Sequence, residues 1–201
     1  MIKNVIFDFG KVLVDFEPTY MTSRYIDNIE DIKLVSDVLF DRLYWDRLDA
    51  GTISDSEVIS KSCKRLPQRL HQKVADIYNN WMYNLPEICG MRELLQKLSD
   101  KGVRLFLLSN ISEGFAKKSS EFSILSYFER CFFSAVCGLT KPSAEIFNYL
   151  LNECGIKAEE TLFVDDSQKN ILGAKGAGIS TYLFDGDSKK LESFLRDNGI
   201  L

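Results

Sequence analysis

Five short apolar stretches stand out along the chain, and none shows the strict alternation of a half-buried strand. They span residues 4–9, 103–110, 130–136, 161–166 and 180–185. Continuous apolar character is typical of strands that are covered by helices on both faces of a sheet. We therefore predict five strands of one buried, parallel sheet.

Helical periodicity separates these stretches. Residues 91–102 and 141–155 have apolar positions at helical spacing and end on glycine, and residues 167–178 repeat the pattern. Glycine after the last periodic residue is a common helix end. Alternating strands and helices predict an α/β fold, a three-layer, doubly wound parallel sheet with a Rossmann-like core.

One long segment breaks this alternation. Residues 17–86 contain no convincing strand and read as several amphipathic helices. We predict that residues 1–16 and 87–201 form the α/β core and that residues 17–86 form an inserted helical cap. Four aromatic residues of the insert are interpreted as cap core rather than as ligand contacts: Tyr44, Trp45, Trp81 and Tyr83.

Composition excludes several classes of function. The chain has 201 residues, a net charge of -4 and no stripe of Lys or Arg, so nucleic acid is not an expected partner. No apolar run approaches the roughly 20 residues of a membrane helix, and no signal peptide is recognisable. Five scattered cysteines without a C-x-x-C pair favour reduced thiols in a cytoplasmic protein. His71 is the only histidine, which excludes multi-histidine zinc sites.

Polar residues end several of the predicted strands. Asp8 follows the first, Ser109 and Asn110 end the second, and Asp165 and Asp166 end the fourth. Lys141, before a predicted helix, lies between the third and fourth strands. The carboxyl ends of parallel strands meet at one edge of a sheet, where ligands bind. We therefore expect these side chains to converge.

These residue types suit phosphoryl transfer. A carboxylate can attack phosphorus and form an aspartyl-phosphate, but its charge repels a phosphate unless a divalent cation is present. Mg²⁺ prefers hard oxygen ligands such as Asp8 and Asp166. Lys141 can offset charge, and Ser109 can donate a hydrogen bond to a phosphoryl oxygen.

Four motifs resemble those of the haloacid dehalogenase superfamily, in the order of that family. They read "IFDFGKVLVD", "LLSN", "GLTKP" and "FVDDSQKN". The helical insert also falls where the capped phosphatase branch carries its cap, so the resemblance covers essentially the whole chain. The wording of the motifs is most similar to that of small sugar-phosphate phosphatases, such as the alpha-glucose-1-phosphate phosphatases.

The resemblance implies a role for each position. Asp8 is the expected nucleophile and a Mg²⁺ ligand, and the backbone carbonyl of Gly10 is a second ligand. Asp166 is expected to be the principal ligand of the fourth motif, with Asp165 binding directly or through water. The expected phosphate-binding residues are Ser109, Asn110 and Lys141, of which Lys141 also assists catalysis. Asn170 is expected to orient the acidic loop.

Gly10 departs from the family pattern. Most phosphatases of the family have an aspartate there, which serves as general acid/base, although the sugar-phosphatase group also has glycine. A general acid/base typically contributes about 10²–10⁴-fold to the rate. The protein can therefore act on a leaving group that needs little protonation, recruit an acid from the cap or a water, or turn over slowly.

A polar turn in the insert supplies two further candidates. The turn "RLDAGTISDSE" ends in a capping box formed by Ser54 and Glu57. In capped members of the family such a turn faces the active site, so Asp49 and Thr52 are candidate substrate contacts.

We thus predict a Mg²⁺-dependent phosphomonoesterase that acts through an aspartyl-phosphate on Asp8. Its expected partner is a small phosphorylated metabolite, in particular a sugar phosphate, with no membrane partner, and the expected assembly is a monomer or homodimer. Two alternatives stay open, a weak or inactive protein that binds a phosphometabolite and a metal-free dehalogenase.

Overall fold

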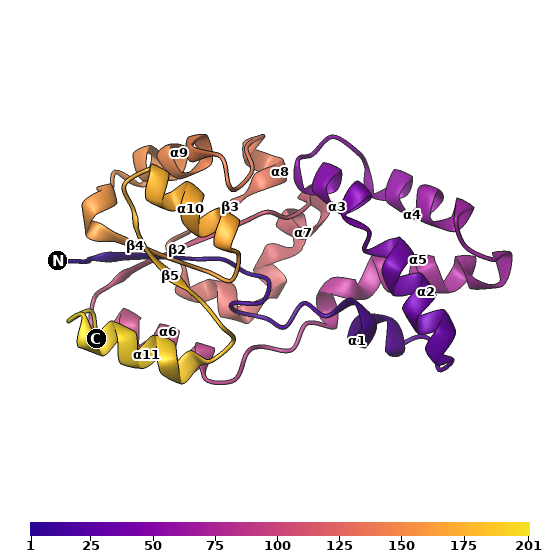
Figure 1. Ribbon diagram of the computed structural model, residues 1–201, viewed down its shortest axis with the longest axis horizontal. Coiled ribbons are helices and arrows are strands. Elements are labelled where there is room, and N and C mark those ends of the chain that lie inside the picture. The colour runs from indigo at the N-terminus through magenta and orange to yellow at the C-terminus, as the bar shows by residue number, and fades with distance from the viewer.

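Five parallel strands form the centre of the molecule (Figure 1). The computed structural model describes residues 1–201. The strands are β1 (Asn4–Phe7), β2 (Arg104–Ser109), β3 (Arg130–Phe133), β4 (Thr161–Asp165) and β5 (Ser180–Leu183). They lie side by side in the order β3-β2-β1-β4-β5, and every neighbouring pair is parallel. The predicted sheet is confirmed.

One predicted strand is too long. Residues 134–136 belong to a short helix, α8 (Ser134–Cys137), and not to the strand predicted over 130–136. Strand β3 lies at the edge of the sheet, and its last residue, Phe133, pairs with Ser109 at the end of β2. No partner strand continues beyond this point, so the apolar run leaves the sheet and turns into a helix.

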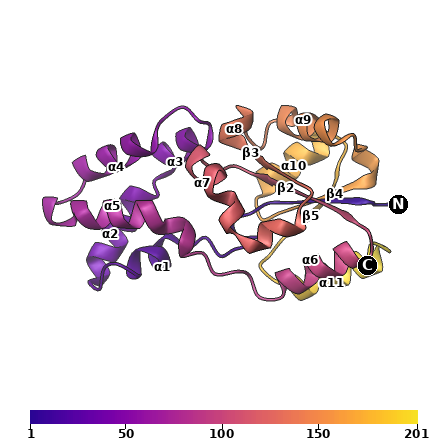
Figure 2. The same cartoon turned by 180° about the vertical axis from the view of Figure 1, so that it is seen from behind.

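Helices cover both faces of the sheet (Figures 1 and 2). α6 (Met91–Asp100) and α11 (Ser188–Asp197) lie on one face, and α9 (Ala144–Cys154) and α10 (Gln168–Gly176) lie on the other. Neighbouring residues of β1 divide between two hydrophobic clusters, Ile6 in the one with α9 and α10 and Phe7 in the one with α6 and α11. The predicted three-layer α/β fold is confirmed.

Five helices lie beyond the carboxyl ends of the strands, and we call them the cap helices (Figure 1). They are α1 (Pro18–Ser23), α2 (Ile29–Leu39), α3 (Arg42–Asp49), α4 (Asp55–Lys64) and α5 (His71–Asn80). Ser54 and Glu57 form the predicted capping box at the start of α4. The remaining α-helix is α7 (Glu113–Lys118), and short 3₁₀ helices span Gln68–Leu70, Trp81–Tyr83, Ser119–Glu121, Ser123–Tyr127 and Ala158–Glu160.

The two chain segments that join the cap helices to the core are bonded to each other. The backbone N–H of Asp15 donates to the Pro86 carbonyl at 2.8 Å, and that of Ile88 donates to the Leu13 carbonyl at 2.9 Å. The outgoing and returning segments therefore form a short two-stranded connector.

Aromatic side chains fill the space between the connector and the cap helices. Rings of Phe16, Trp45 and Trp81 lie with centroids 5.2–5.7 Å apart, mostly edge to face. Such pairs add about 0.5–1.5 kcal/mol beyond their buried area. Tyr44, Trp45 and Trp81 are buried in the hydrophobic core, as predicted, whereas Tyr83 is exposed. Trp45 and Trp81 also line the cavity between the cap helices and the core, so for them the prediction of core packing rather than ligand contact holds only in part.

None of the helices combines the length and the apolar character that a membrane span requires. All five cysteines are unpaired.

A glycine holds the end of α3 close to the core. Gly51 has φ +69°, and a Cβ there would lie 3.1 Å from the Ala135 carbonyl oxygen of α8. We expect Gly51→Ala to reduce the free energy of unfolding by about 1–2 kcal/mol for the left-handed backbone and by more for this contact.

The matched control is Gly102→Ala, because Gly102 has φ +76° with no heavy atom within 4 Å of its added Cβ. Urea denaturation measures the free energy of unfolding of both variants. The loss in Gly102→Ala reports the backbone strain alone, and any larger loss in Gly51→Ala reports the contact with Ala135. An equal loss of stability in the two variants would contradict close packing between the end of α3 and α8.

Candidate active site

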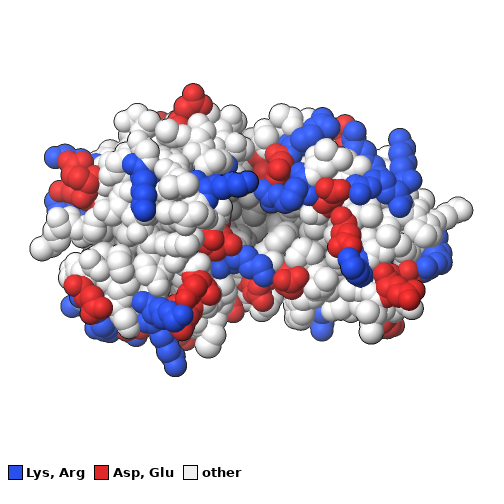
Figure 3. Space-filling view, in the orientation of Figure 1, with Lys and Arg blue, Asp and Glu red and all other residues white.

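A cavity of about 690 Å³ lies between the carboxyl ends of the strands and the cap helices. In the space-filling view it is the hollow at the centre of the molecule, with charged side chains along its rim (Figure 3). The core contributes, among others, Asp8, Gly10, Ser109, Asn110, Lys141 and Asp166. The cap helices contribute Phe40, at the end of α2, and Arg42, Trp45, Asp46 and Asp49 of α3.

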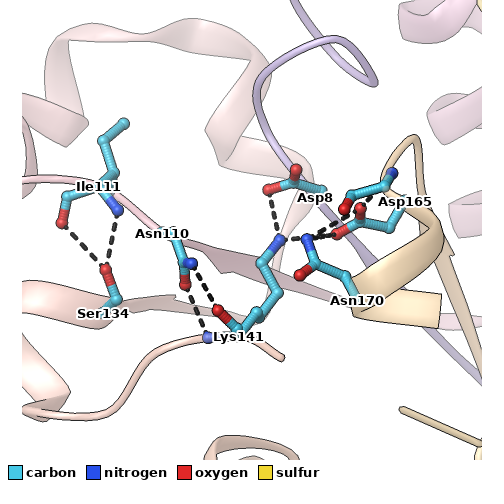
Figure 4. A network of polar contacts seen from close by, with 8 residues as sticks. Asp8, Asn110, Ile111, Ser134, Lys141, Asp165 and Asn170 are labelled. Carbon is cyan, nitrogen blue, oxygen red and sulfur yellow. Dashed lines mark hydrogen bonds and ion pairs between the residues drawn. The ribbon is translucent and has the colours of Figure 1, made fainter. Parts of the chain in front are cut away.

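The Lys141 side chain is the centre of the polar network on the core side (Figure 4). Its ammonium lies 2.7 Å from Asp8 Oδ1 and donates a hydrogen bond of 2.8 Å to Asp165 Oδ2. The contact with Asp8 is an ion pair without hydrogen-bond geometry, so the buried Oδ1 accepts no hydrogen bond. Strands β1 and β4 are neighbours, which places the two carboxylates next to each other.

Burial and charge set the protonation of this group. Desolvation, opposed by Lys141 and reinforced by Asp165, raises the pKa of Asp8 to about 6. For Lys141, burial acts to lower the pKa, but the two facing carboxylates outweigh it and raise the pKa above its ordinary value. Lys141 therefore stays charged at neutral pH, and most of the Asp8 population is ionised and able to act as a nucleophile.

Asp165 is committed to holding this network together. Its oxygens accept hydrogen bonds from the Ser167 N–H at 2.8 Å and from the Asn170 amide at 3.0 Å, in addition to that from Lys141. Asn170 thus fixes the acidic loop at the start of α10.

Asp166 is left available, because its carboxylate accepts no side-chain hydrogen bond and is exposed at the cavity. Burial and the neighbouring Asp165 raise its pKa. Carboxylate oxygens of Asp8, Asp165 and Asp166 lie within 4.8 Å of one another. Three hard oxygen donors, one of them from Asp8, whose buried Oδ1 accepts no hydrogen bond, fit a small divalent cation such as Mg²⁺.

Ser109 and Asn110 lie together but are used differently. Ser109 is buried, lines the cavity, and its hydroxyl has no partner within the protein. Asn110 donates to the Lys141 carbonyl at 2.9 Å and accepts from the Lys141 N–H at 2.8 Å. Its amide therefore fixes the loop that carries Lys141, while the Ser109 hydroxyl is free to bind an anion.

Asp49 and Thr52, the two candidate substrate contacts from the polar turn of the insert, line different cavities. Asp49, the last residue of α3, is only 5% exposed and lines the central cavity. Thr52 lines a different, smaller cavity with Ser54 and Glu113, and its hydroxyl donates to the Arg47 carbonyl at 3.0 Å. The structure thus brings Asp49, but not Thr52, to the other predicted site residues.

Sequence reasoning did not identify Arg42 and Asp46 as cavity residues. Together with Trp45 and Asp49 they form one face of α3, at spacings of three, four and seven residues. This periodicity is visible in the sequence, but its polar members give no indication of whether the face meets solvent or a cavity.

We expect Lys141→Met to lower the free energy of unfolding by about 3–5 kcal/mol at neutral pH, because it leaves two buried carboxylates without a counter-charge. Lys11→Met is the control. Its ammonium pairs with Asp15 and Glu17 at the surface, which is worth about 0–1 kcal/mol.

The loss is expected to depend on pH. A carboxyl whose pKa is raised in the folded state contributes stability that is fully present below its unfolded value and lost as the pH rises through the folded value. Asp8 has an ordinary pKa of 3.8 and a folded pKa of about 6 with Lys141 in place. Below about pH 6 Asp8 is mostly protonated in both folded proteins, so its contribution to the Lys141→Met defect grows above this pH, where only the wild type has an ammonium to stabilise the carboxylate. Urea denaturation at several pH values without added metal checks this, and a pH-independent defect would contradict the role of Lys141.

Comparison with known proteins finds phosphatases of similar sequence. A D-ribitol-5-phosphate phosphatase of Bacteroides thetaiotaomicron is 29% identical over 196 residues, covering 90% of this chain and 91% of the relative. A phosphorylated carbohydrates phosphatase of Thermotoga maritima is 25% identical and covers 87% of this chain and 81% of its own length.

A solved structure with a similar fold is that of a HAD family enzyme from Bacteroides thetaiotaomicron in complex with magnesium and inorganic phosphate. Its TM-score is 0.71 at 25% identity, covering 95% of this chain and 99% of that one. The model of the haloacid dehalogenase-like hydrolases matches residues 5–184. The chain therefore belongs to the haloacid dehalogenase-like hydrolase family.

Proposed function

We propose that this protein is a Mg²⁺-dependent phosphomonoesterase whose substrate is a small phosphorylated metabolite, in particular a sugar phosphate. The observation that carries the proposal is the buried Lys141 ammonium between Asp8 and Asp165, next to the free carboxylate of Asp166 and the free hydroxyl of Ser109. The relatives named as phosphatases of ribitol phosphate and of phosphorylated carbohydrates support the substrate class.

Asp8 is the nucleophile of this proposal. Its carboxylate lines the cavity, and Lys141 holds it through the ion pair at Oδ1, which orients it for in-line attack on phosphorus. Lys141 and the Ser109 hydroxyl would bind the phosphoryl oxygens and stabilise the charge that moves onto them. Water would then hydrolyse the resulting aspartyl-phosphate and return Asp8 as a carboxylate.

The carboxylates of Asp8 and Asp166, with the Gly10 carbonyl, would hold the Mg²⁺ ion, and Asp165 would contribute directly or through a water. A Mg²⁺ ion bound there supplies positive charge that offsets the repulsion between Asp8 and the phosphate. Gly10 lines the cavity beside Asp8, which supports this role for its backbone carbonyl.

The cavity has the size and chemistry of a site for a small polar molecule. Its volume lies in the range of small-molecule sites, about 300–1,000 Å³. Arg42 and Asp46 offer a donor and an acceptor opposite the phosphate, and Trp45 and Trp81 offer apolar surface. Unpaired cysteines agree with a reducing compartment such as the cytoplasm.

We expect purified protein to release inorganic phosphate from a panel of sugar phosphates with Mg²⁺ and to lose this activity with EDTA. Asp8→Asn should lower kcat by several orders of magnitude, because the amide cannot attack phosphorus. The control is Asp185→Asn. Asp185 is an exposed carboxylate near the same end of β5 that pairs with Lys190 outside the cavity.

Activity that survives both EDTA and Asp8→Asn would refute the mechanism. Stabilisation by sugar phosphates without any phosphate release would indicate a binding protein instead of an enzyme.

Mg²⁺ alone should raise the melting temperature, because a ligand that binds only the folded state at 100 times its Kd adds about 2.7 kcal/mol of stability. Asp166→Asn should abolish most of this shift by removing a charged ligand, and Asp185→Asn should retain it. Differential scanning fluorimetry across a Mg²⁺ titration measures the effect. An unchanged shift in Asp166→Asn would exclude Asp166 as a ligand.

A further inference from the structure

The core side of the cavity has no obvious donor of a proton to a leaving group. Gly10, two residues after Asp8, has no side chain, although its backbone does not require glycine: φ is not left-handed, and an added Cβ would meet only Phe16 Cβ at 3.7 Å. An acidic side chain would therefore fit at position 10, but the residue there is glycine. An alkoxide is a poor leaving group, so a side chain elsewhere on the cavity wall that can donate a proton would speed its departure.

Few titratable side chains line the cavity. No histidine, tyrosine, cysteine or glutamate is among its residues, and the carboxyl groups are those of Asp8, Asp46, Asp49 and Asp166. Asp8 is the nucleophile and Asp166 lies in the acidic cluster next to it. Asp46 is exposed and already has a counter-ion, since it pairs with Arg42 at 2.5 Å. Asp49 is the remaining carboxyl.

The lysines of the wall are unsuitable as acids. Lys141 must stay charged between Asp8 and Asp165. For Lys11, burial acts to lower the pKa, but hydrogen bonds to Asp15 and Glu17 outweigh it and raise the pKa. Lys169 extends from the first turn of α10 on the core side of the cavity, beside Asn170.

The surroundings of Asp49 favour its protonated form. Its carboxyl forms no hydrogen bond or ion pair with the protein, and it ends α3, where the helix dipole disfavours negative charge. Desolvation raises the pKa of Asp49 to about 8, opposed by Arg42 and Lys141 and reinforced by Asp46 and Asp8. Tyr78 of α5 also faces it, and that hydroxyl donates to Asp55 at 2.6 Å.

Asp49 is tied directly to the phosphate side of the cavity. The Ser134 hydroxyl donates to the Asp49 carbonyl at 2.6 Å. It also accepts from the Ile111 N–H at 2.9 Å (Figure 4). Ile111 follows Ser109 and Asn110 in the chain. One buried hydroxyl therefore sets the position of α3 relative to the loop that would bind the phosphate.

The direction of attack by Asp8 determines where the leaving oxygen would lie. Asp8 would approach phosphorus from the core side, and in-line displacement places the leaving oxygen on the opposite side, toward the cap helices. Asp49 is the carboxyl on that side of the cavity that has no counter-ion.

We propose that Asp49 is the general acid/base of the reaction, a catalytic residue supplied by the cap in place of a side chain at position 10. This inference rests on the proposed phosphatase function. As an Asp8 oxygen bonds to phosphorus, the bond from phosphorus to the substrate oxygen breaks, and that oxygen keeps the electron pair. The Asp49 carboxyl transfers its proton there, so that an alcohol leaves and Asp49 becomes a carboxylate.

The second half of the reaction restores both groups. The Asp49 carboxylate accepts a proton from the attacking water, whose oxygen bonds to phosphorus while the bond from phosphorus to the Asp8 oxygen breaks. Inorganic phosphate leaves, Asp8 is again a carboxylate, and Asp49 is again protonated.

Leaving-group dependence tests this role. We choose p-nitrophenyl, phenyl and p-methoxyphenyl phosphate, which have similar shapes and leaving groups of increasing basicity, and measure kcat/KM because it reports the steps up to release of the phenol. Asp49→Asn should lower kcat/KM little for the nitrophenyl ester and by about 10²-fold or more for the methoxyphenyl ester. Asp46→Asn, from the same helix face and the same cavity, removes a carboxylate that is paired with Arg42 and transfers no proton, so it should change kcat/KM by a similar factor for all three esters.

The outcomes separate the two proposals. Equal losses for all three esters in Asp49→Asn, or no loss at all, would show that Asp49 only contacts substrate or does nothing, and would overturn the inference while leaving the phosphatase assignment intact. A wild-type protein that hydrolyses neither these esters nor sugar phosphates would overturn both. Circular dichroism checks folding, and Asp49→Ser is assayed in the same way should the asparagine variant not fold.

Discussion

The position of one buried ammonium determines much of this molecule. Lys141 is almost fully inaccessible to solvent, and it lies within 2.8 Å of carboxylates from two neighbouring strands. Without it Asp8 and Asp165 would face each other in a region of low polarity, where like charges repel strongly. Surrounding groups therefore serve to hold Lys141, as Asn110 does through two hydrogen bonds to its backbone and Asn170 through Asp165.

The need to hold the Lys141 ammonium in place explains why the site residues have two different roles. Asp165 and Asn110 have their polar atoms engaged within the protein and act by position. Ser109 and Asp166 have free polar atoms at the cavity and are suited to bind what enters it. A site that contains both kinds is rigid before substrate arrives, so binding energy is not spent on ordering it.

The sequence predicted the sheet and the core half of the site because both follow from local patterns. Asp8 ends an apolar run, and parallel strands bring such ends together whatever the loops between them do. The cap half was harder to predict. Asp49 and Thr52 are three residues apart in one polar turn, yet only Asp49 lines the cavity. Which of them does so depends on how α3 packs against α8, and that is a tertiary contact without a local pattern.

Tertiary context also explains why the strand predicted over residues 130–136 ends early. Residues 134–136 are apolar enough for a strand, but β2 has already ended beside them. Ser134 then becomes available to join the Ile111 N–H to the Asp49 carbonyl. A residue that the hydrophobic pattern assigns to the sheet thus connects the two halves of the site.

The connector between the cap helices and the core has a mechanical consequence. Its two segments are hydrogen-bonded at Asp15 and at Ile88, so neither can twist without straining the other. Any displacement of the cap helices would therefore move both segments together, and it would have to break the hydrogen bond from Ser134 to the Asp49 carbonyl before α3 could leave the core.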